Sequence, residues 1–492
     1  MYTDCTNGIV MFGGSTLGTG LLRLERMATG ISGTANEIEV VGALFKDMDV
    51  AISLEGMVNS LTIQSTFNNC SQPLDLSQIT NLGYLSIRNS NFVYGGSLVL
   101  SLVEETVYDF KNMSFENSTS NTAVIITSTR KESTFNSLNL SNGERGITFT
   151  GTGSLAISGS ITNYTCGLEV ETTSVDFSVS LSNVGTGLIV TNSTDVDIHT
   201  SYFGEVMVPV DINPSVHSFI ISYSLFERSG PVHFWNYNST GGVYQSKFRD
   251  MNDGAISLVG GTSWRVSQNE FENISSASDG GCLVLENGDF DLWMSDFTNV
   301  SSYGNGGAIY SRNASIKIET CNFYNASGLS GGALYGEDME SVDIENNSYF
   351  SGCTALTYGG AIEIENSELR AELFDVSFVD NSAENGAAVS CCSNSTDCNV
   401  TVNIVYDSVT LTHNENREQN GSDISCAIYV TPTQTPIPIH SISSGHGTGF
   451  YVGIWILIFA ILFGCCGGVF AAVFIVLKKK RDKDMGRYEE ID

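Results

Sequence analysis

Basic residues are scarce in this chain of 492 residues. The 22 lysines and arginines stand against 54 aspartates and glutamates, which gives a formal net charge of −32. Six of the basic residues lie in the last 15 positions, so the other 477 positions hold only 16. A surface this acidic repels phosphate backbones and anionic lipid headgroups. The composition therefore argues against nucleic acid as a partner.

Helical periodicity is also lacking before the C-terminal region. Short stretches of alternating apolar and polar residues occur instead, as in residues 314–320, ASIKIET. Alternation with a period of two is typical of half-buried strands. Strands joined by short polar turns, without helices between them, exclude a fold of βαβ units. The body of the chain is therefore predicted to be all-β.

What the chain has in plenty is internal repetition. Residues 306–309, GGAI, return as GGAL at 331–334 and as GGAI at 359–362, with a variant, GGCL, at 280–283. Each copy is followed by a Phe, and two more Phe residues precede them, with spacings of 23, 26, 26, 27 and 28 residues: Phe248, Phe271, Phe297, Phe323, Phe350 and Phe378. A period of about 25 residues indicates a solenoid.

Three short strands in each repeat predict a parallel β-helix. We expect it to occupy residues 1–427 in roughly 16 coils, with its clearest repeats at 248–390. A body with an irregular N-terminal half is the alternative. The Phe residues should stack in one internal column, and Asn273, Asn299 and Asn325 should form a hydrogen-bonded ladder at a turn. The Gly pair suits a corner with positive φ.

The repeat GGA(I/L) with its Phe-and-Asn turn resembles the repeats of the chlamydial polymorphic outer membrane proteins, which are autotransporters that end in a β-barrel. It is more similar to surface proteins of protozoan parasites, trichomonads in particular, that carry these repeats on one transmembrane helix. The bacterial turn is usually FxxN, whereas here it is FxN at Phe271, Phe297 and Phe323, and FxxN only at Phe378–Asn381. The resemblance implies a right-handed, pectin-lyase-like β-helix and a role in adhesion, and it supplies no catalytic residue.

A single long apolar run stands near the C-terminus. Residues 450–477 are 28 positions without a charged side chain, which is long enough to cross a bilayer as a helix. Four basic residues follow at 478–481 and mark the cytosolic flank. We therefore expect a stalk rich in Pro, Ser, Thr and Gly at 428–449, a transmembrane helix at 450–477 and a cytoplasmic tail at 478–492. The expected arrangement is that of a single-pass type I protein of the plasma membrane, with the N-terminal body extracellular and the C-terminus cytoplasmic.

No signal peptide is visible at the start of the chain, although an extracellular body needs one. We expect the N-terminus to be incomplete, and a tail-anchored cytosolic protein is the alternative. The membrane helix and tail carry two further patterns. Ala460, Gly464, Gly468 and Ala472 recur every four residues and predict a face for helix association, hence a homodimer. Tyr488 and Ile491 fit a YxxΦ sorting motif.

Glycosylation sequons and cysteines favour a secreted body. The 15 sequons all lie before the stalk: Asn69, Asn112, Asn117, Asn139, Asn163, Asn192, Asn238, Asn273, Asn299, Asn313, Asn325, Asn346, Asn394, Asn399 and Asn420. Ten of the 12 cysteines are in the body, and an oxidising compartment would pair them. Cys391, Cys392, Cys398 and Cys426 predict a disulfide-closed cap at 391–426, with the pairing left open. Zinc binding with His413 is the rival interpretation.

Few residues point to catalysis. Asp195, Asp197 and His199 alternate on one strand and could bind a cation or act as acid and base, although an ordinary solvent face over buried Val196 and Ile198 is the favoured interpretation. The polygalacturonase-like Gly445-His446-Gly447 lies just before the membrane run. We predict no catalytic residue, metal or cofactor.

The expected function is binding. Trp235, Trp264 and Trp293 are the candidates for an exposed binding patch. We expect an adhesin or surface antigen that binds an extracellular protein or glycan of a host cell or matrix. A membrane-tethered carbohydrate-active enzyme is the alternative, and a passive coat protein is the third.

Overall fold

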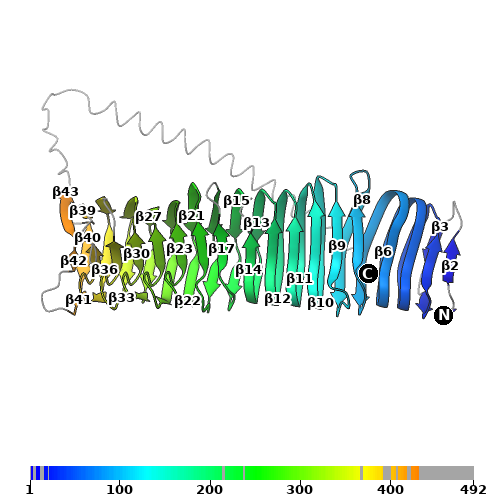
Figure 1. Ribbon diagram of the computed structural model, residues 1–492, viewed down its shortest axis with the longest axis horizontal. Coiled ribbons are helices and arrows are strands. Elements are labelled where there is room, and N and C mark those ends of the chain that lie inside the picture. Colours follow the sequence, from blue (N-terminus) through cyan, green and yellow to red (C-terminus); the bar gives the residue numbers. More distant parts are fainter. Residues whose placement is uncertain are drawn as a thin grey trace, which may run out of the picture. The chain divides into compact units, whose positions relative to one another are not determined.

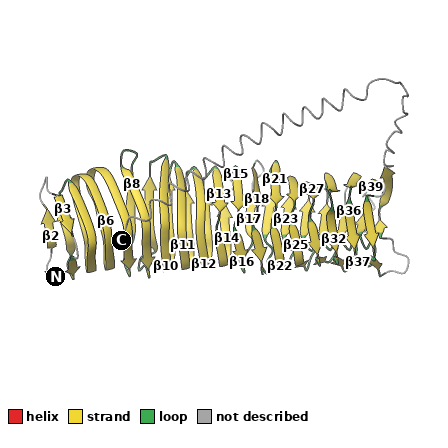
Figure 2. Ribbon diagram, turned by 180° about the vertical axis from the view of Figure 1, so that it is seen from behind, coloured by secondary structure: helices red, strands yellow, loops and turns green. Residues whose placement is uncertain are grey.

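Successive turns of the chain stack along one axis in the computed structural model (Figures 1 and 2). The structure describes residues 2–3, 7–11, 16–19, 22–212, 216–235, 239–365, 370–391, 400–405, 408–417 and 423–431. They form an all-β parallel solenoid of about 16 turns, within a unit that spans residues 1–433. The β-helix prediction is confirmed at this level. The predicted transmembrane helix, most of the stalk and the tail lie outside the described residues, which contain no helix able to span a bilayer.

In the N-terminal half, several strands are long and continue around the corners of a coil. The first twelve strands are β1 (Tyr2–Thr3), β2 (Asn7–Met11), β3 (Thr16–Thr19), β4 (Arg23–Glu25), β5 (Thr29–Gly33), β6 (Glu37–Val93), β7 (Leu98–Leu102), β8 (Val107–Glu116), β9 (Thr122–Ser128), β10 (Glu132–Gly151), β11 (Ser154–Glu171) and β12 (Ser174–Thr191).

The later coils separate into three parallel ladders. Ladder A contains β13 (Asp195–His199), β15 (Ser218–Ser222), β18 (Thr240–Tyr244), β21 (Ser263–Ser267), β24 (Asp289–Trp293), β27 (Ser315–Glu319), β31 (Ser341–Glu345), β35 (Arg370–Leu373), β39 (Thr401–Val405) and β43 (Ala427–Thr431). Ladder B contains β14 (Tyr202–Ile212), β16 (Leu225–Glu227), β19 (Lys247–Arg249), β22 (Glu270–Ser276), β25 (Asp296–Ser302), β28 (Asn322–Tyr324), β32 (Ser348–Ser351), β36 (Val376–Val379) and β40 (Val409–Thr412).

Ladder C begins at the repeated Gly corners. It contains β17 (Val232–Trp235), β20 (Ile256–Val259), β23 (Leu283–Glu286), β26 (Ile309–Arg312), β30 (Leu334–Glu337), β34 (Ile362–Glu365), β38 (Val389–Cys391) and β42 (Ile424–Ser425). Between ladders B and C, the end of β25 pairs with a short series: β29 (Ser327–Gly328), β33 (Thr354–Ala355), β37 (Ser382–Ala383) and β41 (Glu415–Asn416).

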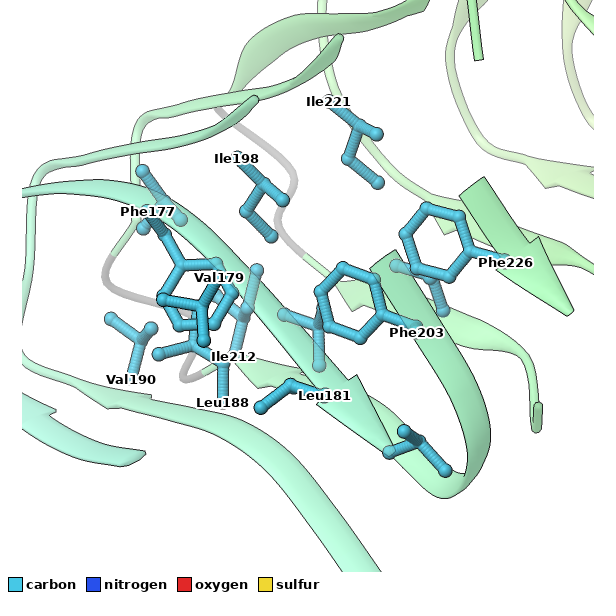
Figure 3. Packing of buried hydrophobic residues seen from close by; sticks show 14 of the residues in the cluster. Phe177, Val179, Leu181, Leu188, Val190, Ile198, Phe203, Ile212, Ile221 and Phe226 are labelled. Carbon is cyan, nitrogen blue, oxygen red and sulfur yellow. The ribbon is translucent and has the colours of Figure 1, made fainter. Parts of the chain in front are cut away.

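The predicted Phe column is confirmed. The rings from Phe271 to Phe378 stack at centroid distances of 4.7, 4.7, 4.6 and 5.1 Å, and all are buried. The same register position continues upstream, so the irregular N-terminal half is not found. Aliphatic residues take the place of the aromatic ring at Leu140, Ile161 and Leu181, and again at Leu24 in an early coil. Figure 3 shows where Leu181 gives way to Phe203 and Phe226.

A left-handed corner follows the Phe column two residues later. Asn273, Asn299 and Asn325 have φ values of 53°, 54° and 53°, which Asn tolerates better than other residues with a side chain. Each Nδ2 donates to the preceding coil: Asn325 to Asn299 Oδ1 at 3.1 Å and Asn299 to Asn273 Oδ1 at 3.3 Å. The predicted Asn ladder is therefore confirmed.

The Gly pair also has the predicted role. Gly306 adopts φ of 68°, and a Cβ added to Gly307 would lie 2.0 Å from the carbonyl oxygen of Gly332. The first Gly provides the left-handed turn, and the second allows close approach of neighbouring coils.

Only part of the cysteine prediction is correct. Cys391 and Cys426 form a disulfide at the C-terminal end of the solenoid, while Cys392, Cys398 and Cys5 lie outside the described residues. The expectation that all body cysteines pair is wrong for five buried free thiols: Cys70, Cys166, Cys282, Cys321 and Cys353. They fill separate inward positions as small apolar side chains. Burial raises the pKa of Cys70, Cys321 and Cys353 to about 12.

The Phe column predicts a large loss of stability on truncation. Replacement of Phe323 by Ala should lower the free energy of unfolding by about 3–5 kcal/mol, because it leaves a cavity between two stacked rings. The exposed Phe374 is the matched control, and its replacement by Ala should change stability by about 0.5 kcal/mol or less. Urea titration followed by circular dichroism measures both, and equal losses would contradict the packed column.

The Asn ladder predicts that the stability of the fold depends on the left-handed backbone conformation at the corner more than on the glycosylation sequon to which the Asn belongs. Asn299→Ala should destabilise the protein by about 1–2 kcal/mol, because Ala pays the left-handed penalty and both ladder bonds are lost. Asn299→Gly loses the same bonds and the same sequon but tolerates positive φ. It should therefore retain more stability in the same titration. If the Ala and Gly variants melt alike, the corner does not constrain this position.

Candidate functional site

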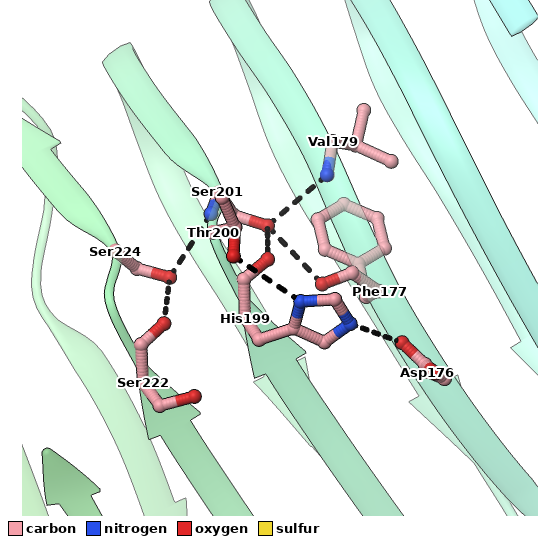
Figure 4. A network of polar contacts seen from close by, with 8 residues as sticks. All are labelled: Asp176, Phe177, Val179, His199, Thr200, Ser201, Ser222 and Ser224. Atoms are coloured by element: carbon pink, nitrogen blue, oxygen red, sulfur yellow. Dashed lines mark hydrogen bonds and ion pairs between the residues drawn. The ribbon is translucent and has the colours of Figure 1, made fainter. Parts of the chain in front are cut away.

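An acidic face with one histidine lies on the outer side of ladder A. Asp195, Asp197 and His199 alternate with the buried Val196 and Ile198 along β13, so the prediction that they share one face is confirmed. His199 Nε2 lies 2.6 Å from Asp176 Oδ1, in the preceding coil (Figure 4). Asp176 is also the register partner of Asp197. The structure therefore places one imidazole and two carboxylates next to one another in register.

The electrostatics of this face centre on Asp197. Partial burial raises the pKa of its carboxyl group, the nearby His199 opposes the shift, and the negative charge of Asp176 adds to it. His199 Nδ1 is 3.4 Å from Thr200 Oγ1, so both ring nitrogens have polar neighbours. Glycosidases use two carboxyl groups about 5–9.5 Å apart, and Asp176 and Asp197 are register partners on adjacent strands, whose spacing is about 4.8 Å. The face is open to water, and the described residues contain no cluster of three or more metal-binding side chains.

Asp176 was missed in the sequence because its role depends on the stacking register. It lies 23 residues before His199, on a coil where the Phe column is aliphatic and the repeat is hard to see. A signal does exist, since Val175-Asp176-Phe177 aligns with Val196-Asp197-Ile198.

A buried polar spine beneath this face was also missed. Ser201 Oγ accepts from the backbone N–H of Val179 at 3.1 Å, and Ser224 Oγ accepts from that of Ser201 at 3.1 Å (Figure 4). The next coil repeats this bond, since Ser246 Oγ accepts from the backbone N–H of Ser224. Each Ser stands two residues before a column Phe, so the motif S-x-F in the sequence was the available signal. This spine fixes the backbone next to His199 and is structural.

The three candidate tryptophans do not form one patch. Trp235 is exposed, with 62% of its surface accessible. The expectation for Trp264 is wrong: it is fully buried, donates from Nε1 to the Gly260 carbonyl at 2.9 Å and packs edge-on against Phe234. Gly241, its register partner in the preceding coil, leaves room for the indole. Trp293 is half-buried, and Arg265 lies 5.2 Å above its ring.

An exposed apolar column lies elsewhere, between ladders B and C. Tyr303, Leu329 and Leu356 each follow, by two residues, the register-paired Ser301, Ser327 and Thr354. Their exposed fractions are 86%, 41% and 63%. Neighbouring strands in a sheet are about 4.8 Å apart, so these side chains form a strip over three consecutive coils. Leu329 and Leu356 are level in this strip, whereas Tyr303 is displaced along the chain because the Leu329 N–H donates to the Gly304 carbonyl. We call this strip the apolar column.

Most described sequons serve the fold. Eleven of the fifteen sequon asparagines are described, and ten of these have positive φ: Asn69, Asn112, Asn117, Asn163, Asn192, Asn273, Asn299, Asn313, Asn325 and Asn346. Asn139 is the exception and accepts from Ser160 Oγ at 2.8 Å on a strand. Asn238, Asn394, Asn399 and Asn420 lie outside the described residues, as do the association face at 460–472, the sorting motif at Tyr488 and Ile491, and the Gly445-His446-Gly447 fragment.

The pKa shift of Asp197 predicts a pH-dependent effect on stability. A carboxyl pKa that is higher in the folded state stabilises the fold at low pH, and this contribution disappears as pH rises through the folded pKa. Asp197→Asn removes a charge that the folded state disfavours, so its melting temperature should exceed that of the wild type at pH 7. The difference should vanish near pH 3, where both side chains are neutral.

The control for this experiment is Asp195→Asn on the same face. Its register partners are Ser174 and Ser218 rather than another carboxylate. A melting temperature for Asp197→Asn below that of the wild type at pH 7 would contradict a raised carboxyl pKa at Asp197 in the folded state.

The chain matches no model of a known protein family. No curated protein and no solved structure gives a match either.

Proposed function

We propose that this chain is a surface-anchored β-solenoid that works by binding, as an adhesin or surface antigen. The observation that carries the proposal is the apolar column of Tyr303, Leu329 and Leu356. Exposed aromatic and aliphatic side chains gathered on consecutive coils are of the kind that marks protein interaction sites. The acidic exterior around it favours a partner with a complementary basic surface.

The anchoring part of the proposal rests on the sequence. The apolar run 450–477 and the basic residues after it support a single-pass type I arrangement with the solenoid outside the cell. The face of Ala460, Gly464, Gly468 and Ala472 supports pairing of two copies. Pairing would raise the avidity of a weak contact. The repeat pattern supports a right-handed β-helix like those of the trichomonad surface proteins, and a sorting role for Tyr488 and Ile491 belongs to the same proposal.

A second candidate is a membrane-tethered carbohydrate-active enzyme. The Asp176, Asp197 and His199 face favours it, because the two carboxylates and the imidazole are adjacent on an outer sheet face. Turnover of a polysaccharide that is abolished by Asp197→Asn, a variant expected to be stable, would rank this function above binding. A passive coat protein is the third option, and it requires neither the apolar column nor the face of Asp176, Asp197 and His199.

The test is adhesion of cells that express the full chain. Surface display is measured with an antibody to the solenoid, and adhesion is measured on a panel of cells, matrix proteins and glycans. The double variant Tyr303→Ser and Leu356→Ser should reduce adhesion at least tenfold at equal display. The matched control is Tyr223→Ser with Met207→Ser, two residues that are also exposed but lie outside the apolar column. A secretory signal peptide is fused to the N-terminus for this experiment, because none is visible in the chain. Equal adhesion of both double variants would overturn the binding site, and lack of display of the fusion would overturn the surface location.

A further inference from the structure

A hollow of about 490 Å³ opens in the N-terminal part of the solenoid, between β6 and β7. Its apolar lining comes from two successive coils and includes Leu74, Leu76, Ile79, Leu82 and Leu100. This volume lies in the range of about 300–1,000 Å³ that is usual for ligand sites. The hollow is separate from the apolar column and from the Asp176–His199 face, and the proposed function does not use it.

One wall of the hollow is a strand edge. β7 pairs in register with β9 of the following coil, and in the described part of the chain no register pairs β7 with the preceding coil. The Leu102 carbonyl accepts from Thr129 of the following coil at 3.0 Å. Because backbone groups alternate in direction along a strand, those of Val99, Ser101 and Val103 point to the opposite side, toward the hollow.

A tyrosine hydroxyl occupies part of this edge. Tyr108 Oη accepts from the N–H of Val103 at 2.8 Å and donates to the carbonyl of Ser101 at 3.3 Å. These are the bonds that a neighbouring strand would make. The side chains of Val99 and Val103 are exposed beside it. The edge therefore still offers the backbone groups of Val99 and the N–H of Ser101, together with apolar surface, to a bound segment.

The negative charge of the lining determines which kind of peptide segment the hollow can bind. The carboxylates of Asp75 and Glu105 line it. The cation Arg130 lies beside it, and its guanidinium is 5.0 Å from the ring centroid of Tyr108 and donates to the carbonyl of Thr106. Asp75 Oδ1 accepts from the backbone N–H and the hydroxyl of Ser77, at 3.1 and 2.7 Å, which fixes that carboxylate in place. An acidic segment would be repelled, whereas a basic one gains two partners.

We propose that the hollow binds a short, extended, cationic peptide segment of a partner protein by strand addition along β7. The segment is no longer than the five residues of β7. Its aliphatic side chains enter the hollow, and its Lys or Arg side chains reach Asp75 and Glu105. This site would give the acidic rod a second contact, independent of the apolar column.

The test uses the full chain in nanodiscs of neutral phosphatidylcholine and fluorescein-labelled peptides that alternate Lys and Leu. Fluorescence anisotropy should show saturable binding that weakens with salt, whereas peptides that alternate Glu and Leu should not bind. Val99→Pro removes one N–H that faces the hollow and keeps the pairing with β9, since Pro is tolerated on an open edge. It should weaken binding at least tenfold, as should the hollow-filling Ile79→Trp.

Charge and folding have their own controls. Asp75→Asn with Glu105→Gln should lower the affinity and flatten its salt dependence, while Glu171→Gln, on an exposed position of β11, should not. A Lys-Leu peptide N-methylated at alternate residues tests strand addition without any protein variant, and it should not bind. Equal affinity of the methylated peptide, or no saturable binding of the parent, overturns the proposal. Tight binding of octylammonium with no peptide binding would instead assign the hollow to small amphiphilic amines.

Discussion

The structure depends on one constraint: most described strands pair with their equivalents in the coils before and after them. Because these pairings are parallel and keep register, a side chain at a given position stacks on the same position of the next coil. Inward positions then become columns, as for the Phe rings from Phe203 to Phe378. Corners become ladders, as for Asn273 to Asn325. The polar spine beginning at Ser201 obeys the same rule inside the core.

This constraint explains which features of the fold could be predicted from the sequence alone. Where the same residue type recurs, the period is visible, so the Phe column, the Asn ladder and the Gly corners could be predicted. Where the column changes to Leu140, Ile161 and Leu181, the coil continues but the pattern fades. Contacts between coils were predictable only where that pattern is clear. Asp176 was therefore missed as the partner of His199, and the room that Gly241 leaves for Trp264 was missed as well.

The same constraint gives a structural explanation for the sequon asparagines and the cysteines, which in the sequence favoured a secreted protein. Ten sequon asparagines occupy left-handed corners, so backbone geometry explains their identity without reference to glycans. Five buried cysteines occupy inward positions and remain thiols, so they carry no information about an oxidising environment. The Cys391–Cys426 disulfide is the cysteine feature that fits the predicted cap. The proposed surface location thus depends mainly on the apolar run and its basic flank.

The disulfide has a mechanical consequence for a rod under tension. The hydrogen bonds between coils run along the axis, so a pull on the C-terminal end would peel the solenoid one coil at a time. When peeling reaches Cys426, the load passes through the sulfur bridge directly to Cys391. The two cysteines are 35 positions apart in the sequence, and that segment would bear no force. Reduction of the bridge would release this length of chain, so the redox state of one bond would set how far the rod extends before its next coil yields.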